Sequence, residues 1–447
     1  MVKADSPHPH ASAISDTSRR SSYEDKFEHA AMYLEPAIHK VGLVRNASNT
    51  AAFINIVCIV AGSGTLGIPY AIRLSGWIGL VLLMLSAVMS NYAGTLLIKC
   101  LYFDPNRRLS GFAEIGYEAF GKYGRVLVLA FNYFLLLFTP VLYLILAGDN
   151  LSALLQPLHV PLSMKAWVWI LTAAVCIPFV VVKNMKEIAV MSLFGSLATV
   201  CVVVVVAVMS VSDYEHTQID HQHDVARPRN FAIALCTFAF SYGGNVIYPQ
   251  VEESMKDPKS WNKVLFAAIF LITAMYVLTG VPCYLVYGNT VKSPVYASIP
   301  AGAPQNIAMI VITVHVLLAI PLYLFSFTME IEQLLGITAA NPKLSRFTRL
   351  TFRTVLRICE LCFCAIVAII IPYFGDFMAL LGAISSGFLL LVFPCLFYVK
   401  LYGRRRIGWL NLIACVLICV IGVFCAVMGT VDALMALAKD FRGTRTP

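Results

Sequence analysis

Residues 60–71 read VAGSGTLGIPYA and lie inside the first apolar span of the chain. They place three glycines and one proline within an uncharged run, about residues 50–72, that is long enough to cross a bilayer. In a helix interior each glycine costs about 1 kcal/mol and the proline about 3 kcal/mol. Broken backbone at membrane depth is tolerated only where it is buried in protein or lines a water-filled cavity. We therefore interpret this break as a candidate binding site.

A second interruption of the same kind lies about 180 residues further along, where residues 241–249 read SYGGNVIYP. Two Gly- and Pro-interrupted spans in corresponding positions of two halves are the best sequence indication of a transporter's substrate site. The alternative is that these glycines serve only close helix packing, as small residues do in membranes. Packing explains neither the prolines nor the matching position of the second break, so we favour a binding site.

The composition indicates a protein embedded in a lipid bilayer. Of 447 residues, 59% are hydrophobic and only 13% are charged, which is too few charges to cover the surface of a soluble protein of this size. The net charge of +9 comes from Lys and Arg residues that lie between apolar spans rather than on one face. This distribution reports membrane orientation, and it argues against a nucleic-acid partner.

We expect no metal site, no cofactor and no enzymatic activity, and we interpret His216, His221 and His223, which lie near three aspartates, as part of a solvated loop, with a metal or pH-sensing site as the alternative. The 13 cysteines lie in or at the ends of apolar spans and show no disulfide framework. Cys359, Cys362 and Cys364 are closely spaced, but no further ligand cluster accompanies them. We find no nucleophile–base pair and no phosphate-binding G-x-x-x-x-G-K-[ST] loop.

We expect an all-α membrane protein with about 11 transmembrane helices. Most of the 33 Lys and Arg residues fall on one side of the membrane if the N-terminus is cytosolic, which supports both the span count and this orientation. The expected spans are residues 50–72, 77–101, 125–155, 166–182, 188–211, 230–254, 262–287, 305–335, 355–373, 377–400 and 409–434.

The two broken spans are the first and the sixth. An odd number of crossings separates them, so the second half is inverted relative to the first, as in LeuT-type transporters. We therefore predict a 5+5 inverted repeat with broken helices 1 and 6, preceded by a polar tail of disordered composition. The expected parts are a cytosolic tail at 1–45, a transporter domain at 46–434 (repeat one 50–211, repeat two 230–400, extra helix 409–434) and a short tail at 435–447.

The breaks offer backbone groups for both ends of an amino acid. Free N–H groups near Gly64 to Gly67, at the positive end of a half-helix, suit a carboxylate. Carbonyl groups released near Val60 and Ala61, and in the second break, suit an ammonium group. We therefore predict a free amino acid as the substrate. The expected substrate-binding residues are Gly62, Ser63, Gly64, Thr65, Leu66, Gly67, Phe240, Ser241, Tyr242, Gly243, Gly244 and Asn245, with Tyr143 as a candidate wall of the pocket for which ordinary packing is the alternative.

Ionisable side chains at membrane depth are costly and often functional. His315 is the only one of nine histidines inside a span, and we hypothesise that it carries or senses a coupled proton. The alternative is a packed, hydrogen-bonded histidine. Glu252, after the second break, is a second candidate for proton relay, with an ion pair to Lys256 at the cytosolic end of the span as the alternative. Asp149, near the outer end of the third span, is expected to order a helix end.

Several motifs carry a resemblance to a known family. Residues 62–71, followed by Gly76 and Trp77, resemble the first-span signature of the amino acid/auxin permeases. Residues 240–258 resemble the sixth-span signature of the same family, and the resemblance extends over about residues 50–400. It is strongest to the fungal and plant vacuolar amino-acid transporters, with the vesicular GABA/glycine transporter related.

This resemblance implies a LeuT-like fold and amino-acid transport, usually coupled to protons. The family's sodium-coupled branch has an asparagine four residues before the first glycine of the break, where this chain has Cys58. We therefore expect a proton-coupled secondary transporter that works by alternating access, in a vacuolar or lysosomal-type membrane or the plasma membrane. The alternatives are a sodium-coupled symporter and an amino-acid-sensing receptor without net flux.

Overall fold

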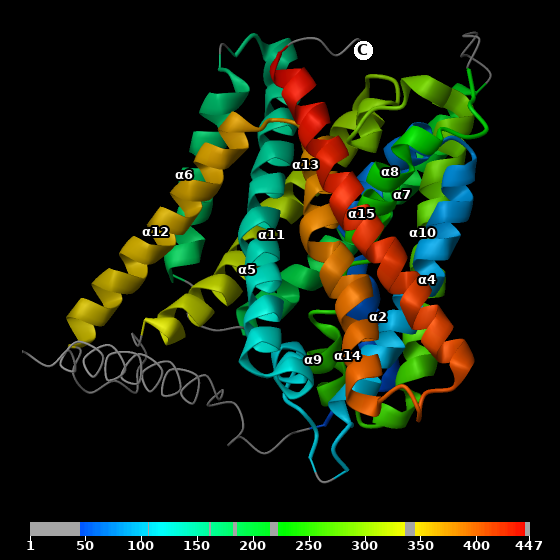
Figure 1. The fold of residues 1–447 in the computed structure, drawn as a ribbon. Helices are drawn as coiled ribbons and strands as arrows, with labels where there is room; N and C mark the ends of the chain where they lie inside the picture. Colours follow the sequence, from blue (N-terminus) through cyan, green and yellow to red (C-terminus); the bar gives the residue numbers. More distant parts are fainter. Residues whose placement is uncertain are drawn as a thin grey trace, which may run out of the picture. The chain divides into compact units, whose positions relative to one another are not determined.

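The computed structural model describes residues 45–105, 107–160, 162–181, 186–214, 222–335 and 345–442 of an all-helical protein (Figure 1). A single β-bridge, Ala47 with Met255, is the one strand-like contact in these ranges. The longer elements are α2 (Asn49–Val60), η2 (Ser63–Gly67), α3 (Ile68–Ser75), α4 (Ile78–Leu101), α5 (Phe112–Leu155), α6 (Met164–Val181), α7 (Lys186–Asp213), α8 (Phe231–Ser241), α9 (Tyr248–Ser254), α10 (Trp261–Tyr287), α11 (Ala303–Leu334), α12 (Arg346–Ile370), α13 (Phe374–Leu381), η8 (Gly382–Val392), α14 (Phe393–Tyr402) and α15 (Trp409–Phe441). Short 3-10 turns are η3 (Gln156–Leu158), η4 (Pro228–Asn230), η5 (Pro258–Ser260), η6 (Gly288–Thr290) and η7 (Val295–Ala297).

The chain divides into two compact units. The larger comprises Val44–Phe327 and Leu356–Pro447 and contains every site discussed below, whereas the smaller includes Thr328–Val355. In the larger unit the core is built around α8, which contacts α3, α4, α13, η8 and α15. This central helix ends at the second break, so the packing of the unit converges on the candidate site.

Membrane crossing is supported by helix length and composition. Within the described ranges, six helices are long and apolar enough to span a bilayer, and the bent pair of α2 with η2–α3 raises this to seven. The remaining predicted spans correspond in position to α6, α7, α12 and the pair α8–α9. The count of 11 crossings and the inverted repeat stay predictions.

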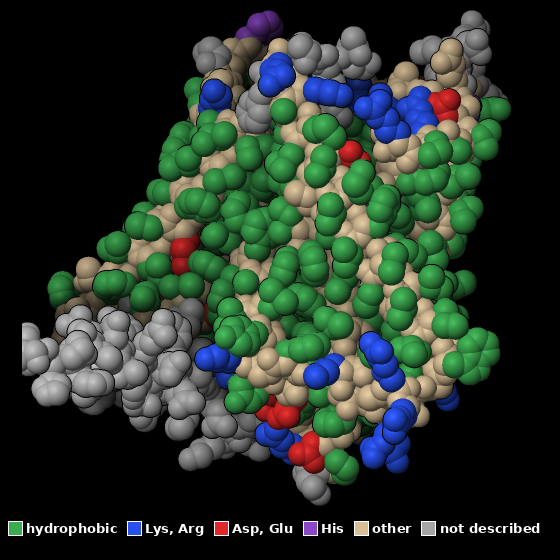
Figure 2. All heavy atoms as spheres, in the orientation of Figure 1, with side chains coloured by type: hydrophobic (Ala, Val, Ile, Leu, Met, Phe, Trp, Pro, Cys, Tyr) green, Lys and Arg blue, Asp and Glu red, His purple; other side chains and the backbone are tan. Residues whose placement is uncertain are grey.

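The surface has the distribution expected of a membrane protein. On the face shown in Figure 2, hydrophobic side chains cover the middle of the helices, and Lys and Arg side chains lie toward their ends. Hydrocarbon excludes charged side chains, whereas both membrane surfaces tolerate them.

The first predicted break is present. Helix α2 ends at Val60 because Gly62 has φ −107° and ψ −139°, which is outside the helical region. A 3-10 turn, η2, then leads into α3, where Pro69 occupies the first turn and needs no intrahelical hydrogen bond. The two halves are bent by 44°. The second break is also present, between α8 and α9, with Pro249 at the start of α9.

Two helices differ from the sequence expectation. The third predicted span begins at residue 125, but α5 begins at Phe112 and has a kink at Phe120 and Gly121, where Gly121 has φ +63°. The tenth predicted span contains η8, an 11-residue π-helix between α13 and α14. A π-helix of this length is unusual. Most π-helical segments are single-turn bulges inside α-helices, and these bulges are frequent at functional sites. Hydrophobic periodicity does not distinguish it from an α-helix.

We predict that Gly382→Ala destabilises the protein, because a Cβ at Gly382 would overlap the Cys236 carbonyl of α8. Overpacking of this kind costs about 1–3 kcal/mol. Gly387→Ala in the same π-helix is the matched control, since its Cβ would lie 3.5 Å from the nearest atom. Thermal unfolding of detergent-purified protein measures both variants. Equal unfolding temperatures would contradict the close α8–η8 approach.

Candidate functional site

The two breaks lie in direct contact. The Ser241 hydroxyl oxygen, at the end of α8, lies 3.1 Å from the Gly64 carbonyl and 2.8 Å from the Thr237 carbonyl. A Cβ on Gly64 would lie only 2.6 Å from the Ser241 Cα, so no larger residue fits at this position. The fold thus brings together the two segments that the sequence singled out.

A tyrosine from α10 joins the open ends of both helices. The Tyr276 hydroxyl lies 2.6 Å from the Ser241 carbonyl oxygen and 3.2 Å from the Val60 carbonyl oxygen. Carbonyl groups at helix ends lack an intrahelical donor and need one from elsewhere. Here the single O–H of Tyr276 donates at the shorter distance to the Ser241 carbonyl and lies within reach of the Val60 carbonyl, and both carbonyls are in regions that we had expected to be available for an ammonium group. The sequence did not identify Tyr276 as a site residue. Its only indication in the sequence is that a side chain with a hydroxyl group lies in the middle of an apolar span.

The N-terminal side of η2 provides the other half of the site. The Thr65 N–H donates to the Gly62 carbonyl at 3.1 Å, so the outer half-helix already begins at Ser63. Its unsatisfied N–H groups are therefore expected at Ser63 and Gly64, rather than as far as Gly67. The hydroxyl of Ser63 donates to the Tyr143 hydroxyl at 3.3 Å.

Tyr143 therefore lies at the break. Its buried ring packs edge-to-face against Tyr323 of α11, with 5.7 Å between ring centroids. The sequence did not identify Tyr323. These two tyrosines face the first break from α5 and α11.

The loop of the second break is held by η8. The Asn245 amide nitrogen donates to the Leu389 and Leu390 carbonyls at 3.3 and 2.9 Å. Within the part of the chain that the structure describes, the Asn245 side-chain oxygen is buried without a hydrogen-bond partner. A buried acceptor without a donor is costly unless a ligand supplies one.

Other predicted residues contribute to the walls. A Cβ on Gly244 would lie 2.7 Å from a methyl group of Val60, so the second break also packs against the end of α2. Thr65 and Leu66 are fully buried, and Gly243 lies near Ser386 of η8. The side chain of Tyr242 turns instead toward α10, where its hydroxyl lies 2.8 Å from that of Thr273.

The breaks are covered on their outer side, which we define as the side on which α3 ends. Met378 of α13 is fully buried and packs directly on Gly67. Thr237 lies on the same face of Gly67. In this structure, therefore, Met378 covers the first break at Gly67.

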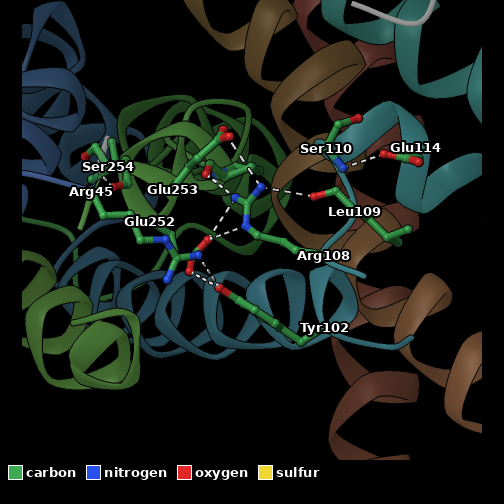
Figure 3. A network of polar contacts seen from close by, with 11 residues as sticks. Arg45, Tyr102, Arg108, Leu109, Ser110, Glu114, Glu252, Glu253 and Ser254 are labelled. Carbon is green, nitrogen blue, oxygen red and sulfur yellow. Dashed lines mark hydrogen bonds and ion pairs between the residues drawn. The ribbon is translucent and has the colours of Figure 1, made fainter. Parts of the chain in front are cut away.

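The opposite end is closed by an ion pair, shown in Figure 3. Glu252 of α9 is fully buried, and its Oε2 lies 2.8 Å from Nη2 and 2.9 Å from Nε of Arg108, in the α4–α5 connection. The Tyr102 hydroxyl donates to the other carboxylate oxygen, and Arg108 also donates to the Pro249 carbonyl at 2.6 Å. The partner of Glu252 is thus Arg108, and not the Lys256 considered from the sequence.

Backbone pairing ties the same end together. The Ala47 N–H donates to the Ser254 carbonyl, and the Lys256 N–H donates to the Ala47 carbonyl, both at 2.9 Å. The start of α2 is thereby fixed to the end of α9. Each of these helices is one half of a broken span, so these hydrogen bonds join one half of the first broken span to one half of the second.

His315 lies away from the breaks. It is in α11, eight residues and therefore about 12 Å along the helix from Tyr323. Its ring packs directly on Gly195 of α7. The structure thus places the two proton-coupling candidates, His315 and Glu252, in different parts of the larger unit, and neither contacts the breaks through a hydrogen bond that we observe in the described residues.

Comparison with solved structures supports a transporter fold. The chain superimposes on a Na⁺-coupled sialic acid symporter in a substrate-bound outward-open state with a TM-score of 0.53 and 12% identity, over 92% of this chain and 97% of the symporter. It matches a manganese transporter of Eremococcus coleocola with a TM-score of 0.50 and 10% identity, over 92% and 90% of the two chains. At these identities the likeness shows the fold alone, which is that of the LeuT-type transporters.

Sequence comparison identifies the family. The chain matches the model of the family described as "Transmembrane amino acid transporter protein" over residues 45–435. It is 28% identical to amino acid transporter AVT1B of Arabidopsis thaliana over 90% of this chain and 73% of that protein. It is 27% identical to the vesicular inhibitory amino acid transporter of Xenopus tropicalis over 87% and 77% of the two chains.

The chain belongs to the transmembrane amino acid transporter family and is an integral, multi-pass membrane protein. The family resemblance inferred from the sequence is confirmed. So is the expectation of a transporter rather than an enzyme, because the relatives are named as transporters.

We predict that Glu252→Gln destabilises the protein by about 3–5 kcal/mol, because it leaves the Arg108 guanidinium without its buried counter-charge. Glu253→Gln is the control, since the Glu253 carboxylate is 3.8 Å from Arg108, is 29% exposed and is expected to contribute less than about 1 kcal/mol. Thermal unfolding measures each variant. The double variant with Arg108→Met should recover part of the loss. Equal losses from Glu252→Gln and Glu253→Gln would contradict the assignment.

Proposed function

We propose that this protein is a secondary active transporter that moves free amino acids across a membrane by alternating access, with protons as the coupled ion. The observation that carries the proposal is the contact between two interrupted helices at Gly64 and Ser241. Interrupted helices meeting at membrane depth expose backbone groups that hold a charged solute. Family membership supports an amino acid as that solute.

The two ends of an amino acid find different partners in this arrangement. The carboxylate would accept hydrogen bonds from the Ser63 and Gly64 N–H groups, at the positive end of η2–α3. The ammonium group would donate to the Asn245 side-chain oxygen, which is buried without a donor among the described residues. Displacement of the Tyr276 hydroxyl would release the Val60 and Ser241 carbonyls for the same group.

Alternating access needs two closures that open in turn. On the outer side, Met378 packs on Gly67. On the opposite side, Arg108 and Glu252 hold α9 to the α4–α5 connection. Opening the outer closure separates α3 from α13, whereas opening the other breaks the ion pair. The proposed cycle alternates between these two events, with the amino acid at the breaks.

Proton coupling rests on three observations. Cys58 stands where the sodium-coupled branch of the family has an asparagine. His315 is a histidine within a membrane-spanning helix, and Glu252 is a fully buried carboxylate. We propose His315 as the proton-binding group, since Glu252 is already held by Arg108. A sodium-coupled symporter and an amino-acid receptor without flux are the outcomes that would replace this proposal.

The proposed orientation has the N-terminus and the Arg108–Glu252 ion pair on the cytosolic side. The excess of Lys and Arg on that side supports it. A vacuolar or lysosomal-type membrane, or the plasma membrane, is the proposed location. The vesicular transporter among the relatives favours an internal membrane.

We predict that proteoliposomes containing the purified chain accumulate at least one member of a panel of radiolabelled amino acids under an imposed pH gradient. One proton moving down 2 pH units supplies about 2.7 kcal/mol, enough for about 100-fold accumulation. Gly64→Val should abolish uptake because its side chain would displace Ser241. Gly408→Val, at a position with no atom within 4 Å of the added Cβ, is the control and should transport normally.

Three outcomes separate the alternatives. Uptake that requires a sodium gradient and ignores the pH gradient would replace protons by sodium. Saturable binding without accumulation would favour a receptor. Full uptake by Gly64→Val, with the variant present in the liposomes, would remove the breaks as the substrate site.

We predict that His315→Ala weakens the dependence of uptake on the pH gradient while leaving downhill exchange of the amino acid intact, since only the proton step is lost. Uptake measured at a series of imposed gradients tests this. His159→Ala, an exposed histidine after α5, is the control. An unchanged gradient dependence in His315→Ala would exclude His315 as the proton group.

A further inference from the structure

The C-terminal ends of two half-helices meet at one tyrosine side chain. Val60 is the last residue of α2 and Ser241 is the last residue of α8. The Tyr276 hydroxyl oxygen lies 3.2 Å from the Val60 carbonyl oxygen and 2.6 Å from the Ser241 carbonyl oxygen. The C-terminal end of a helix carries about half a negative charge from the aligned peptide dipoles. Two such ends that face one point favour a cation at that point.

A third oxygen faces the same place. Thr65, in η2, is fully buried, and its hydroxyl lies close to that of Tyr276. Among the described residues the Thr65 hydroxyl forms no well-aligned hydrogen bond. A buried oxygen without a partner is unfavourable, whereas a cation between the helix ends would use it as a ligand. The Val60 carbonyl, the Ser241 carbonyl and the Thr65 hydroxyl thus form a set of oxygens around the Tyr276 hydroxyl.

The position of Tyr276 is fixed by its neighbours. The side chain is fully buried, and its ring packs edge-to-face against that of Tyr242, with 5.2 Å between the ring centroids. Tyr242 is held in turn by α10, because its hydroxyl lies 2.8 Å from that of Thr273. The two tyrosines therefore brace each other, and the Tyr276 hydroxyl keeps its place between the helix ends.

A hydroxyl group at this point is an uncharged substitute for a cation. Its proton carries the positive end of the O–H dipole and is directed at the Ser241 carbonyl, which is the closer of the two acceptors. A neutral donor satisfies this carbonyl without the cost of taking an ion out of water. One proton does not fully satisfy two carbonyls and the Thr65 oxygen, so the set of oxygens retains the capacity to bind a cation.

We infer that the Tyr276 hydroxyl holds the place of a monovalent cation between the two broken helices and thereby makes the chain independent of sodium. Tyr276 is thus a positioning residue that decides which cation the breaks accept. The inference rests on the proposed function, because it takes transport to proceed without sodium. During transport the ammonium group of the cargo is the cation that displaces the hydroxyl. Between cargo molecules the hydroxyl joins the helix ends without an ion.

The test exchanges the hydroxyl for an ion. In Tyr276→Asn the shorter side chain vacates the place of the hydroxyl and offers an amide oxygen, so Na⁺ gains a fourth oxygen ligand. Thermal unfolding of the full-length chain in detergent is measured in sodium chloride and in choline chloride at equal concentration. We expect Tyr276→Asn to unfold at a temperature at least about 3 °C higher in sodium chloride, whereas the wild type unfolds at the same temperature in both salts.

Tyr284→Asn is the matched control. Tyr284 is also fully buried in α10, but it lies eight residues and therefore about 12 Å further along the helix, where its hydroxyl accepts a hydrogen bond from the Asp224 N–H at 3.1 Å. This variant should lose stability equally in both salts. A sodium response of the same size in Tyr284→Asn would show a general effect of salt and would overturn the inference.

A second variant protects the test against misfolding. Tyr276→Ser also vacates the place of the hydroxyl and keeps a side-chain oxygen, so sodium should raise its unfolding temperature as well. Recovery of either Tyr276 variant as folded protein from sodium chloride but not from choline chloride supports the inference, because a residue that only fills space gives no preference between the two salts.

The outcomes separate this inference from the proposed function. A wild type that unfolds at a higher temperature in sodium chloride overturns the inference and replaces protons by sodium in the proposed function. If sodium changes neither Tyr276→Asn nor Tyr276→Ser, or if both variants aggregate in both salts, the inference is overturned. Proton-driven uptake by the wild type then leaves the transporter proposal standing.

Discussion

The constraint that organises this protein is the need to satisfy backbone polar groups inside an apolar environment. Two helices are interrupted, and the Gly64 carbonyl accepts a hydrogen bond from the Ser241 hydroxyl, whereas the Ser241 carbonyl accepts one from Tyr276. Because an unsatisfied group costs several kcal/mol in hydrocarbon, such breaks persist only where the surrounding helices enclose them. At the broken end of α8, the hydrogen-bond partners come from η2, α10 and η8.

The two sides of the breaks are covered by contacts of different kinds. The outer one is an apolar contact of Met378 on Gly67, whereas the opposite one is the charged pair of Arg108 and Glu252. An apolar closure separates with little electrostatic cost, but a buried ion pair opens readily only if water reaches both charges. The contacts on the two sides therefore differ in the conditions under which they separate.

Much of this arrangement could be predicted from residue types alone. Glycine and proline lower helix stability whatever surrounds them, so both breaks were located to within a few residues. Apolar length located the helices that cross the membrane. Other features depend on contacts between distant segments and have no local signature. The π-helix η8 exists where Gly382 meets the backbone of α8, and the partner of Glu252 is an arginine from the α4–α5 connection rather than the nearby Lys256.

The sequence by itself determined the class of protein, the positions of the breaks and most of the residues that line them, because these follow from hydrophobicity and backbone propensity along the chain. Only the tertiary structure decided which groups remain available at the site. Tyr276 occupies carbonyls that local reasoning left free, and Asn245 retains an unsatisfied oxygen among the described residues. Satisfaction of a polar group is a property of its neighbours in space, and the neighbours here are brought together only by the packing of the helices.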